Sequence, residues 1–93
     1  MTEAVQVQLP PVLRTVVGGL ASVNGVGGTI KEVLKDLATA RPALGLHFFD
    51  ESGNVRRNII CLHDGIVIRA QEFAEHNVRA GDELILTNAL AGG

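Results

Sequence analysis

The 93-residue chain predicts one α+β domain, in which a mixed sheet of four to five strands carries one main helix on one face. Three observations support this class. Apolar and polar residues alternate over 5–9, as in a strand buried on one face. A single amphipathic helix follows over about 30–41. Strand-like segments then come in succession without further long helices, so strands and helices do not alternate as they do in α/β folds.

The first part of the chain predicts a β-hairpin. The strand at 5–9 ends at the two prolines at 10–11, because proline cannot donate to the hydrogen-bond ladder. Residues 20–23 fit a short second strand after a glycine-containing connection. The Asn-Gly pair at 24–25 predicts a turn after this strand.

The helix is the clearest element. Thr29 and Glu32 form a capping-box pattern, in which the Thr hydroxyl accepts from the backbone N–H of Glu32 and the Glu side chain reaches back to the cap. Pro42 predicts an end near residue 41, because the residue before proline avoids the α conformation. One side of the helix is apolar at the expected spacing and carries Ile30, Val33, Leu34, Leu37 and Ala38.

The second half of the chain predicts three further strands. Residues 43–57 are irregular, with at most a short helical turn and a polar turn at 50–54. Asp64-Gly65 is a strong signal for a two-residue hairpin turn. The strands expected around and after it are 58–63, 66–68 and 83–87, with a loop at 70–79 and a turn at 80–82.

Composition argues against several classes of protein. The net charge is −2 and the eight Lys and Arg residues are spread along the chain, whereas nucleic-acid-binding modules carry a basic excess. The single Cys61 excludes an internal disulfide and a multi-cysteine zinc site. No apolar run is long enough for a membrane span, and no signal-peptide pattern opens the chain. We therefore expect a cytoplasmic protein that binds neither nucleic acid nor membrane.

Two further patterns predict no catalytic site. The glycines of 25–28 match neither a P-loop nor a dinucleotide fingerprint, so they are interpreted as turn residues. Cys61 and His63 share one face of a strand, but no acid is evident to orient the histidine as a base. A metal site that combines them with His47 or His76 has no recognised spacing. We expect no catalytic residue and no metal site.

Strand parity predicts a partner-docking patch. If Ile60 and Leu62 face the core, Ile59 and Cys61 face the other side of the sheet, where Ile85 joins them. That face is expected to be polar, so an apolar patch there marks a protein interaction site. The alternatives are that the parity is shifted by one residue or that the preceding loop covers the patch.

Four segments resemble the ubiquitin-like β-grasp sulfur carriers of the MoaD/ThiS type. They are the opening strand and loop at 5–19, the capped helix at 29–37, the strand and turn at 58–65, and the last strand with its Ala-Leu-Ala-Gly-Gly ending at 80–93. The opening strand and the ending are most similar to the carriers of cysteine synthesis and secondary metabolism. Asn88 stands where this subgroup commonly has Pro, and His63 where the family usually has Asn, so the subfamily stays open.

The resemblance implies a body at 1–87 and a flexible tail at 88–93. An E1-like enzyme would adenylate Gly93 with ATP and Mg, and sulfur would then convert it to a thiocarboxylate. Leu90, Ala91 and Gly92 would thread into the partner. A downstream enzyme would accept the sulfide for cysteine, molybdopterin, thiamine-type or secondary-metabolite synthesis. The protein would be a carrier without a permanently bound cofactor and not an enzyme.

The tail also suits threading on physical grounds. Six extended residues reach at most about 20 Å, and glycine has no Cβ, so a narrow channel can close around it. Three alternatives remain open. The tail is only a frayed end, the protein is a ubiquitin-like modifier whose Gly93 joins target lysines, or it is a β-grasp interaction module without reactivity.

Overall fold

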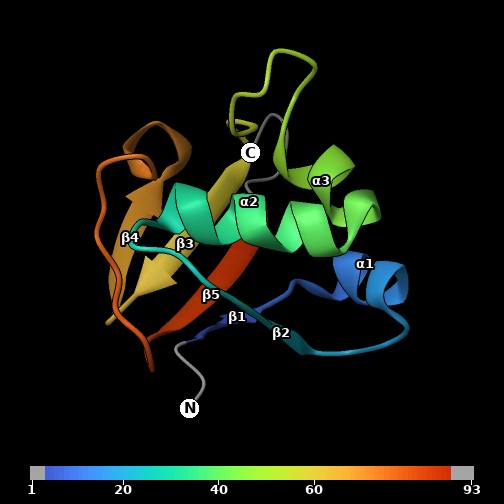
Figure 1. Ribbon diagram of the computed structural model, residues 1–93, viewed down its shortest axis with the longest axis horizontal. Helices are drawn as coiled ribbons and strands as arrows, with labels where there is room; N and C mark the ends of the chain where they lie inside the picture. Colours follow the sequence, from blue (N-terminus) through green and yellow to red (C-terminus); the bar gives the residue numbers. More distant parts are fainter. Residues whose placement is uncertain (1–3, 89–93) are drawn as a thin grey trace.

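The computed structural model describes residues 4–88, which form a five-stranded mixed sheet with helices across one face (Figure 1). The strand order is β2-β1-β5-β3-β4, with β1 parallel to β5 and the other neighbours antiparallel. This confirms the predicted α+β class. The elements are β1 (Val5–Gln8), α1 (Pro11–Arg14), η1 (Thr15–Val17), β2 (Ser22–Gly25), α2 (Ile30–Ala40), α3 (Pro42–Phe48), β3 (Ile59–His63), β4 (Ile66–Arg69), η2 (Ala70–Glu72) and β5 (Glu83–Asn88).

The first hairpin is present, but its second strand lies later than predicted. Asn24 and Gly25 belong to β2, where they pair with Gln6 and Val5, and they do not form the predicted turn. A Cβ on Gly25 would lie 3.0 Å from a methyl carbon of Val33, so glycine here lets α2 approach the strand closely. The connection between the strands contains α1 and η1, where Pro11 occupies the first helical turn.

The predicted cap of α2 is confirmed in its first half. The Thr29 hydroxyl accepts from the Glu32 N–H at 3.2 Å, while Glu32 Oε1 accepts from the Gly28 N–H at 2.8 Å, one residue before the cap. Pro42 ends α2 and opens α3, a helix of seven residues where the sequence indicated only a turn. α3 is stable because it packs on α2 and buries Leu44 and Phe48 in the hydrophobic core.

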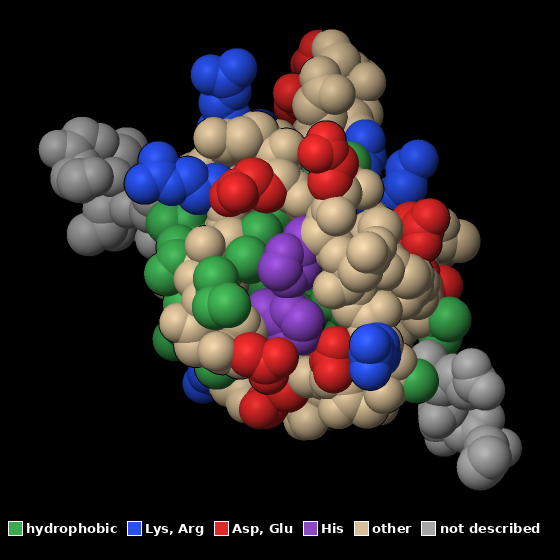
Figure 2. Space-filling model, turned by 90° about the vertical axis from the view of Figure 1, so that its left-hand side faces the viewer, with side chains coloured by type: hydrophobic (Ala, Val, Ile, Leu, Met, Phe, Trp, Pro, Cys, Tyr) green, Lys and Arg blue, Asp and Glu red, His purple; other side chains and the backbone are tan. Residues whose placement is uncertain are grey.

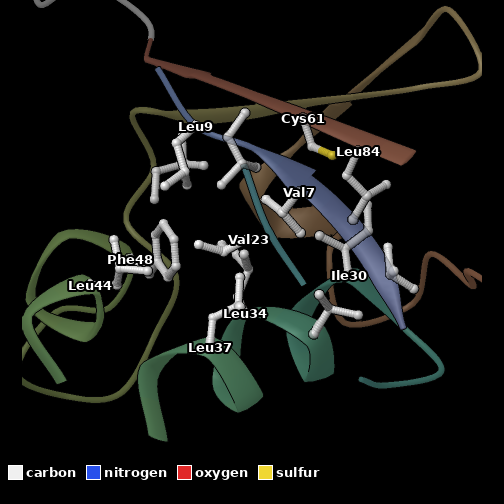
Figure 3. Close-up of a cluster of buried hydrophobic side chains, with 14 of the residues drawn as sticks. Val7, Leu9, Val23, Ile30, Leu34, Leu37, Leu44, Phe48, Cys61 and Leu84 are labelled. Carbon is white, nitrogen blue, oxygen red and sulfur yellow. The ribbon is translucent and has the colours of Figure 1, made fainter. Parts of the chain in front are cut away.

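The core lies between the helices and one face of the sheet (Figure 3). It is almost entirely aliphatic, as the composition predicts, with two fully buried phenylalanines. The described residues include no buried polar or charged side chain. The side chains labelled in the figure are Val7, Leu9, Val23, Ile30, Leu34, Leu37, Leu44, Phe48, Cys61 and Leu84.

The second hairpin has the predicted turn. Asp64 and Gly65 have φ values of 53° and 78°, the left-handed conformations that a two-residue turn requires. β5 lies between β1 and β3 and extends to Asn88, one residue beyond the predicted boundary. The remaining tail residues lie outside the described residues. Within 4–88, no helix is long and apolar enough to cross a membrane.

Candidate docking surface and C-terminal exit

The predicted parity of β3 is wrong. Ile59 and Cys61 are 3% and 0% exposed, and both belong to the core beneath the helices. Ile60 and Leu62, for which the sequence predicts a core position, lie on the opposite face and are partly exposed. The run is apolar at every position, so alternation within it could not distinguish the two faces. Of the predicted patch, only Ile85 is exposed.

The face of the sheet away from the helices, here called the open face, has an apolar centre. Leu62 pairs with Val67 on one side and with Ile85 on the other, so the three side chains form a row across β4, β3 and β5. Val67 is 55% exposed and Ile85 is 38% exposed, and Ile60 lies beside them on β3. Polar side chains of the same parity surround this centre, and these are Gln6, Gln8, Arg69, Glu83 and Thr87.

The chain leaves the sheet close to this apolar centre. Asn88 pairs with Ile59, at the end of the sheet where β3 begins. Ile85 precedes Asn88 by three residues, so the row on the open face and the exit are roughly 10 Å apart along β5. The predicted reactive residue, Gly93, and the predicted threading residues, Leu90 to Gly92, lie outside the described residues. Five residues follow Asn88 and span at most about 17 Å when extended.

Cys61 has the environment of a core residue. Its side chain is fully buried, and its thiol lies 3.7 Å from the carbonyl oxygen of Leu62. Burial raises the pKa of the thiol to about 12. The thiolate is the nucleophilic form of cysteine, so a thiol in this state is inert. His63 lies on the same face of β3 as Cys61, as predicted. Its hydrogen bonds, however, are to other residues and not to the thiol.

His63 belongs to a hydrogen-bonded chain that the sequence analysis missed. Its Nδ1 lies 2.8 Å from His76 Nε2, and its Nε2 lies 3.0 Å from Asp82 Oδ2. The same Asp82 oxygen accepts from the Arg79 N–H at 2.8 Å. A carboxylate only accepts, so His63 donates from Nε2 to Asp82, and in its neutral form it would accept at Nδ1 from His76. Figure 2 shows the two adjacent histidines at the surface, with acidic side chains beside them.

These hydrogen bonds hold the loop before β5 against the end of β3, and they lower the pKa of the Asp82 carboxyl. The Arg79 N–H holds the pKa of the Asp82 carboxyl below its ordinary value, and the hydrogen bond and charge of His63 act in the same direction. The sequence shows that histidines are present at 63 and 76, but it does not predict their contact. No sequence motif relates the end of a strand to a loop residue 13 positions later. Residues 4–88 contain no group of three side chains that could hold a metal ion.

Comparison with known proteins identifies the family. The family model described as the ThiS family matches residues 7–93, which is nearly the whole chain and includes the tail. The chain belongs to the ThiS family. It is therefore a ubiquitin-like sulfur carrier of the MoaD/ThiS type with a β-grasp fold, as the resemblance implied.

Solved structures agree with this ThiS-family assignment. CysO in the Amycolatopsis orientalis BexX/CysO complex is 29% identical over 97% of this chain and all of that one, with a TM-score of 0.77. CysO of Mycobacterium tuberculosis is 25% identical over 92% and 99% of the two chains, with a TM-score of 0.78. SAMP1 of Haloferax volcanii is 29% identical over 97% and 99%, with a TM-score of 0.76. A search of curated proteins gave no match.

Proposed function

We propose that this ThiS-family protein carries sulfur as a thiocarboxylate on Gly93. The observation that supports this most directly is the family match, which extends through the final Gly-Gly. The geometry is consistent with it, because β5 ends five residues before Gly93 and beside an apolar surface. In this proposal the protein is the substrate of its partners, and its own side chains perform no chemistry.

The proposed reaction has two steps. An E1-like enzyme positions the Gly93 carboxylate so that one of its oxygens attacks the α-phosphate of Mg-ATP, which releases pyrophosphate and leaves an acyl adenylate. Sulfur from a persulfide donor then attacks the acyl carbon and displaces AMP. Cleavage of the sulfur–sulfur bond by a thiol leaves the thiocarboxylate. Gly92 suits this chemistry because a channel around the acyl phosphate has no side chain to accommodate there.

The open face is the proposed docking surface for the activating enzyme. Its apolar centre and polar surround resemble the general composition of protein interfaces. The row of Leu62, Val67 and Ile85 lies within about 10 Å of the point where the tail leaves β5. A partner bound on this face could therefore receive the tail without any rearrangement of the sheet.

Intact-mass measurement tests the chemistry. We would incubate the protein with ATP, Mg, a persulfide donor and an E1-like adenylating enzyme from the same organism. The expected product is heavier by the replacement of one oxygen with sulfur, localised to the C-terminal peptide. Removal of Gly93, or Gly92→Val, should abolish the product while the circular dichroism spectrum stays unchanged. A full yield from either variant would contradict the proposal.

Substitutions on the open face test the docking surface. Ile85→Asp and Val67→Asp place a charge in the proposed interface, and both positions are exposed enough for the variants to fold. Thr39→Asp adds the same charge on the exposed side of α2 and serves as the control. We expect at least tenfold weaker binding to the adenylating enzyme for the first two variants and unchanged binding for the control. Equal affinities for all three would place the interface elsewhere.

Protein modification is the second candidate function. It is favoured by the similarity to SAMP1, whose structures carry the description of a small archaeal modifier protein. Both functions begin with adenylation and differ in the nucleophile, which is sulfur in one case and a lysine amine in the other. A ladder of heavier conjugates that depends on Gly93 would support modification, whereas a thiocarboxylate alone would support sulfur transfer.

A further inference from the structure

Two hollows of about 460 and 480 Å³ lie between α2 and the loop that joins α3 to β3. Lys31 lines the first, and Lys35, about one helical turn later, lines the second. On the loop side, Asp50 lines the first hollow and its neighbour Phe49 lines the second. The two hollows therefore form one elongated depression, here called the α2 trough. Figure 1 shows this loop above α2, and η2 closes the end of the trough near the start of the helix.

The charged side chains of α2 are divided between two sides of the helix. Glu32 and Asp36 accept from backbone N–H groups in residues 26–28, at 2.8 and 2.9 Å, so both acids face the segment before the helix. Lys31 and Lys35 line the trough instead. Two like charges about one turn apart slightly destabilise a helix. A negatively charged ligand in the trough would relieve this repulsion.

The trough has an excess of positive charge. Arg57 joins the two lysines in the lining, and Asp50 is the one acidic side chain there. Asp50 Oδ1 accepts from the N–H groups of Ser52 and Asn54 at 2.9 and 3.0 Å, so this carboxylate holds its own turn. Within residues 4–88, no Lys or Arg side chain lies within 4.0 Å of a carboxylate oxygen. The basic side chains of the trough are therefore available to an acidic ligand.

The wall opposite α2 offers an apolar surface. Phe49 and Val55 line the trough, and both are half-buried, with one side packed against the core. Their backbones pair in an isolated β-bridge, and the Asp50 N–H donates to the Asn54 carbonyl oxygen at 2.9 Å, so the wall has a defined conformation. A complementary ligand therefore presents negative charge to α2 and an apolar side chain to the loop.

We propose that the α2 trough binds an extended segment of a partner protein in which two acidic residues flank an apolar one. Lys31 and Lys35 are separated by about 6 Å along the helix axis. Alternate residues of an extended chain point to the same side and are about 6.7 Å apart. The two acidic side chains thus match the two lysines, while the apolar side chain between them points toward Phe49 and Val55.

This interaction goes beyond the proposed function and does not depend on chemistry at the C-terminus. The trough is formed by α2, η2 and the loop before β3, on the side of the sheet that the helices cover. The open face lies on the other side of the sheet. One partner could therefore hold the protein through the trough while an activating enzyme binds the open face.

NMR titration of the full-length protein with a capped peptide, acetyl-Gly-Glu-Leu-Glu-Gly-amide, tests the proposal. We expect amide shifts at Lys31, Lys35 and residues 49–57, and none at Val67 or Ile85 of the open face. Replacing both Glu residues of the peptide with Gln should weaken binding about fivefold, because two ion pairs are lost. Replacing its Leu with Ser should also weaken binding about fivefold. Equal affinity of either altered peptide would overturn the proposal, since the trough would then select for only one half of the motif.

Charge reversal in the protein gives an independent measurement. Lys35→Glu should weaken binding of the same peptide at least about fivefold. Arg69→Glu makes the same change of charge on the open face and should leave the affinity within about twofold. Circular dichroism confirms that both variants are folded. The double variant Lys31→Glu/Lys35→Glu should in turn bind acetyl-Gly-Lys-Leu-Lys-Gly-amide more tightly than wild type does.

Two outcomes of these measurements would overturn the proposal. One is equal peptide affinity for wild type and Lys35→Glu. The other is a shift of the trough resonances that grows with protein concentration in the absence of peptide, because a second copy of the chain would then occupy the trough. ATP, sulfur and partner enzymes are absent from these experiments, so their failure would leave the proposed carrier function unaffected.

Discussion

The carboxylate of Asp82 offers a sharp test of how the loop before β5 is held. Its Oδ2 accepts two hydrogen bonds, from the Arg79 N–H at 2.8 Å and from His63 Nε2 at 3.0 Å. Hydrogen bonds to a charged acceptor contribute about 1.5–3 kcal/mol each, against about 0.5–1.5 kcal/mol for a neutral one. The Asp82 side chain is 28% exposed, so we take the lower end of both ranges.

Two substitutions separate the charge from the bonds. Asp82→Asn retains an oxygen that can accept both bonds as a neutral acceptor, and it should reduce the free energy of unfolding by about 2 kcal/mol at neutral pH. Asp82→Ala removes the acceptor entirely and should reduce it by about 3 kcal/mol. Urea denaturation followed by circular dichroism measures both values. Equal losses for the two variants would refute the idea that the charge and the bonds contribute separately.

The effect of Asp82 should also depend on pH in a defined direction. Its pKa is lowered in the folded protein, so its charge stabilises the fold fully above the unfolded-state pKa of about 3.9. This stabilisation is lost as the pH falls through the lowered folded-state pKa. The difference between wild type and Asp82→Asn should therefore shrink as the pH falls below about 4. A difference that stayed constant at lower pH would contradict this account.

Two further predictions concern packing and reactivity. Gly27→Ala should cost about 1–3 kcal/mol of unfolding free energy in urea denaturation, because its Cβ would lie 2.7 Å from Glu32 Cβ and from the Val33 nitrogen. Gly28→Ala meets only an ordinary contact and should change stability by less than about 0.5 kcal/mol, so comparable losses at both positions would refute the packing argument. Native Cys61 should react with iodoacetamide at pH 8 at least about a thousandfold more slowly than in urea, because its thiol is buried and has a raised pKa. Rapid labelling of the folded protein would show that the strand around it opens readily.

The sequence predicts elements well where a local signal is unambiguous. The cap of α2, the Asp64-Gly65 turn and the last strand are confirmed because each depends on residues close in sequence. The sequence predicts only a turn where α3 lies, because these seven residues have a weak local preference for helix. The helix is stabilised instead by the burial of Leu44 and Phe48. Asn24-Gly25 is a typical turn sequence, but these two residues adopt a strand conformation because they pair with β1 and Gly25 packs under α2.

The error in the docking patch could have been avoided from the sequence. A two-residue turn at Asp64-Gly65 pairs Leu62 with Val67, and Arg69 lies on the same face as Val67. A charged residue at the edge of that face indicates solvent, which would assign Leu62 to the open face and Cys61 to the core. The contact of His63 with His76 cannot be predicted in this way, because it depends on how the long loop before β5 folds.

The parallel pairing of β1 with β5 joins the two ends of the described chain in the middle of the sheet. Leu84 of the last strand is fully buried between neighbours that precede it by tens of residues, so the core cannot close before β5 has been synthesised. Contacts of such long sequence separation slow folding and make it cooperative. During translation β5 is made after all the other strands, so the sheet cannot assemble until the chain has been synthesised through residue 88. The topology couples presentation of the proposed reactive end to successful folding, so misfolded chains, or chains truncated before β5 is complete, would not offer a partner the open face.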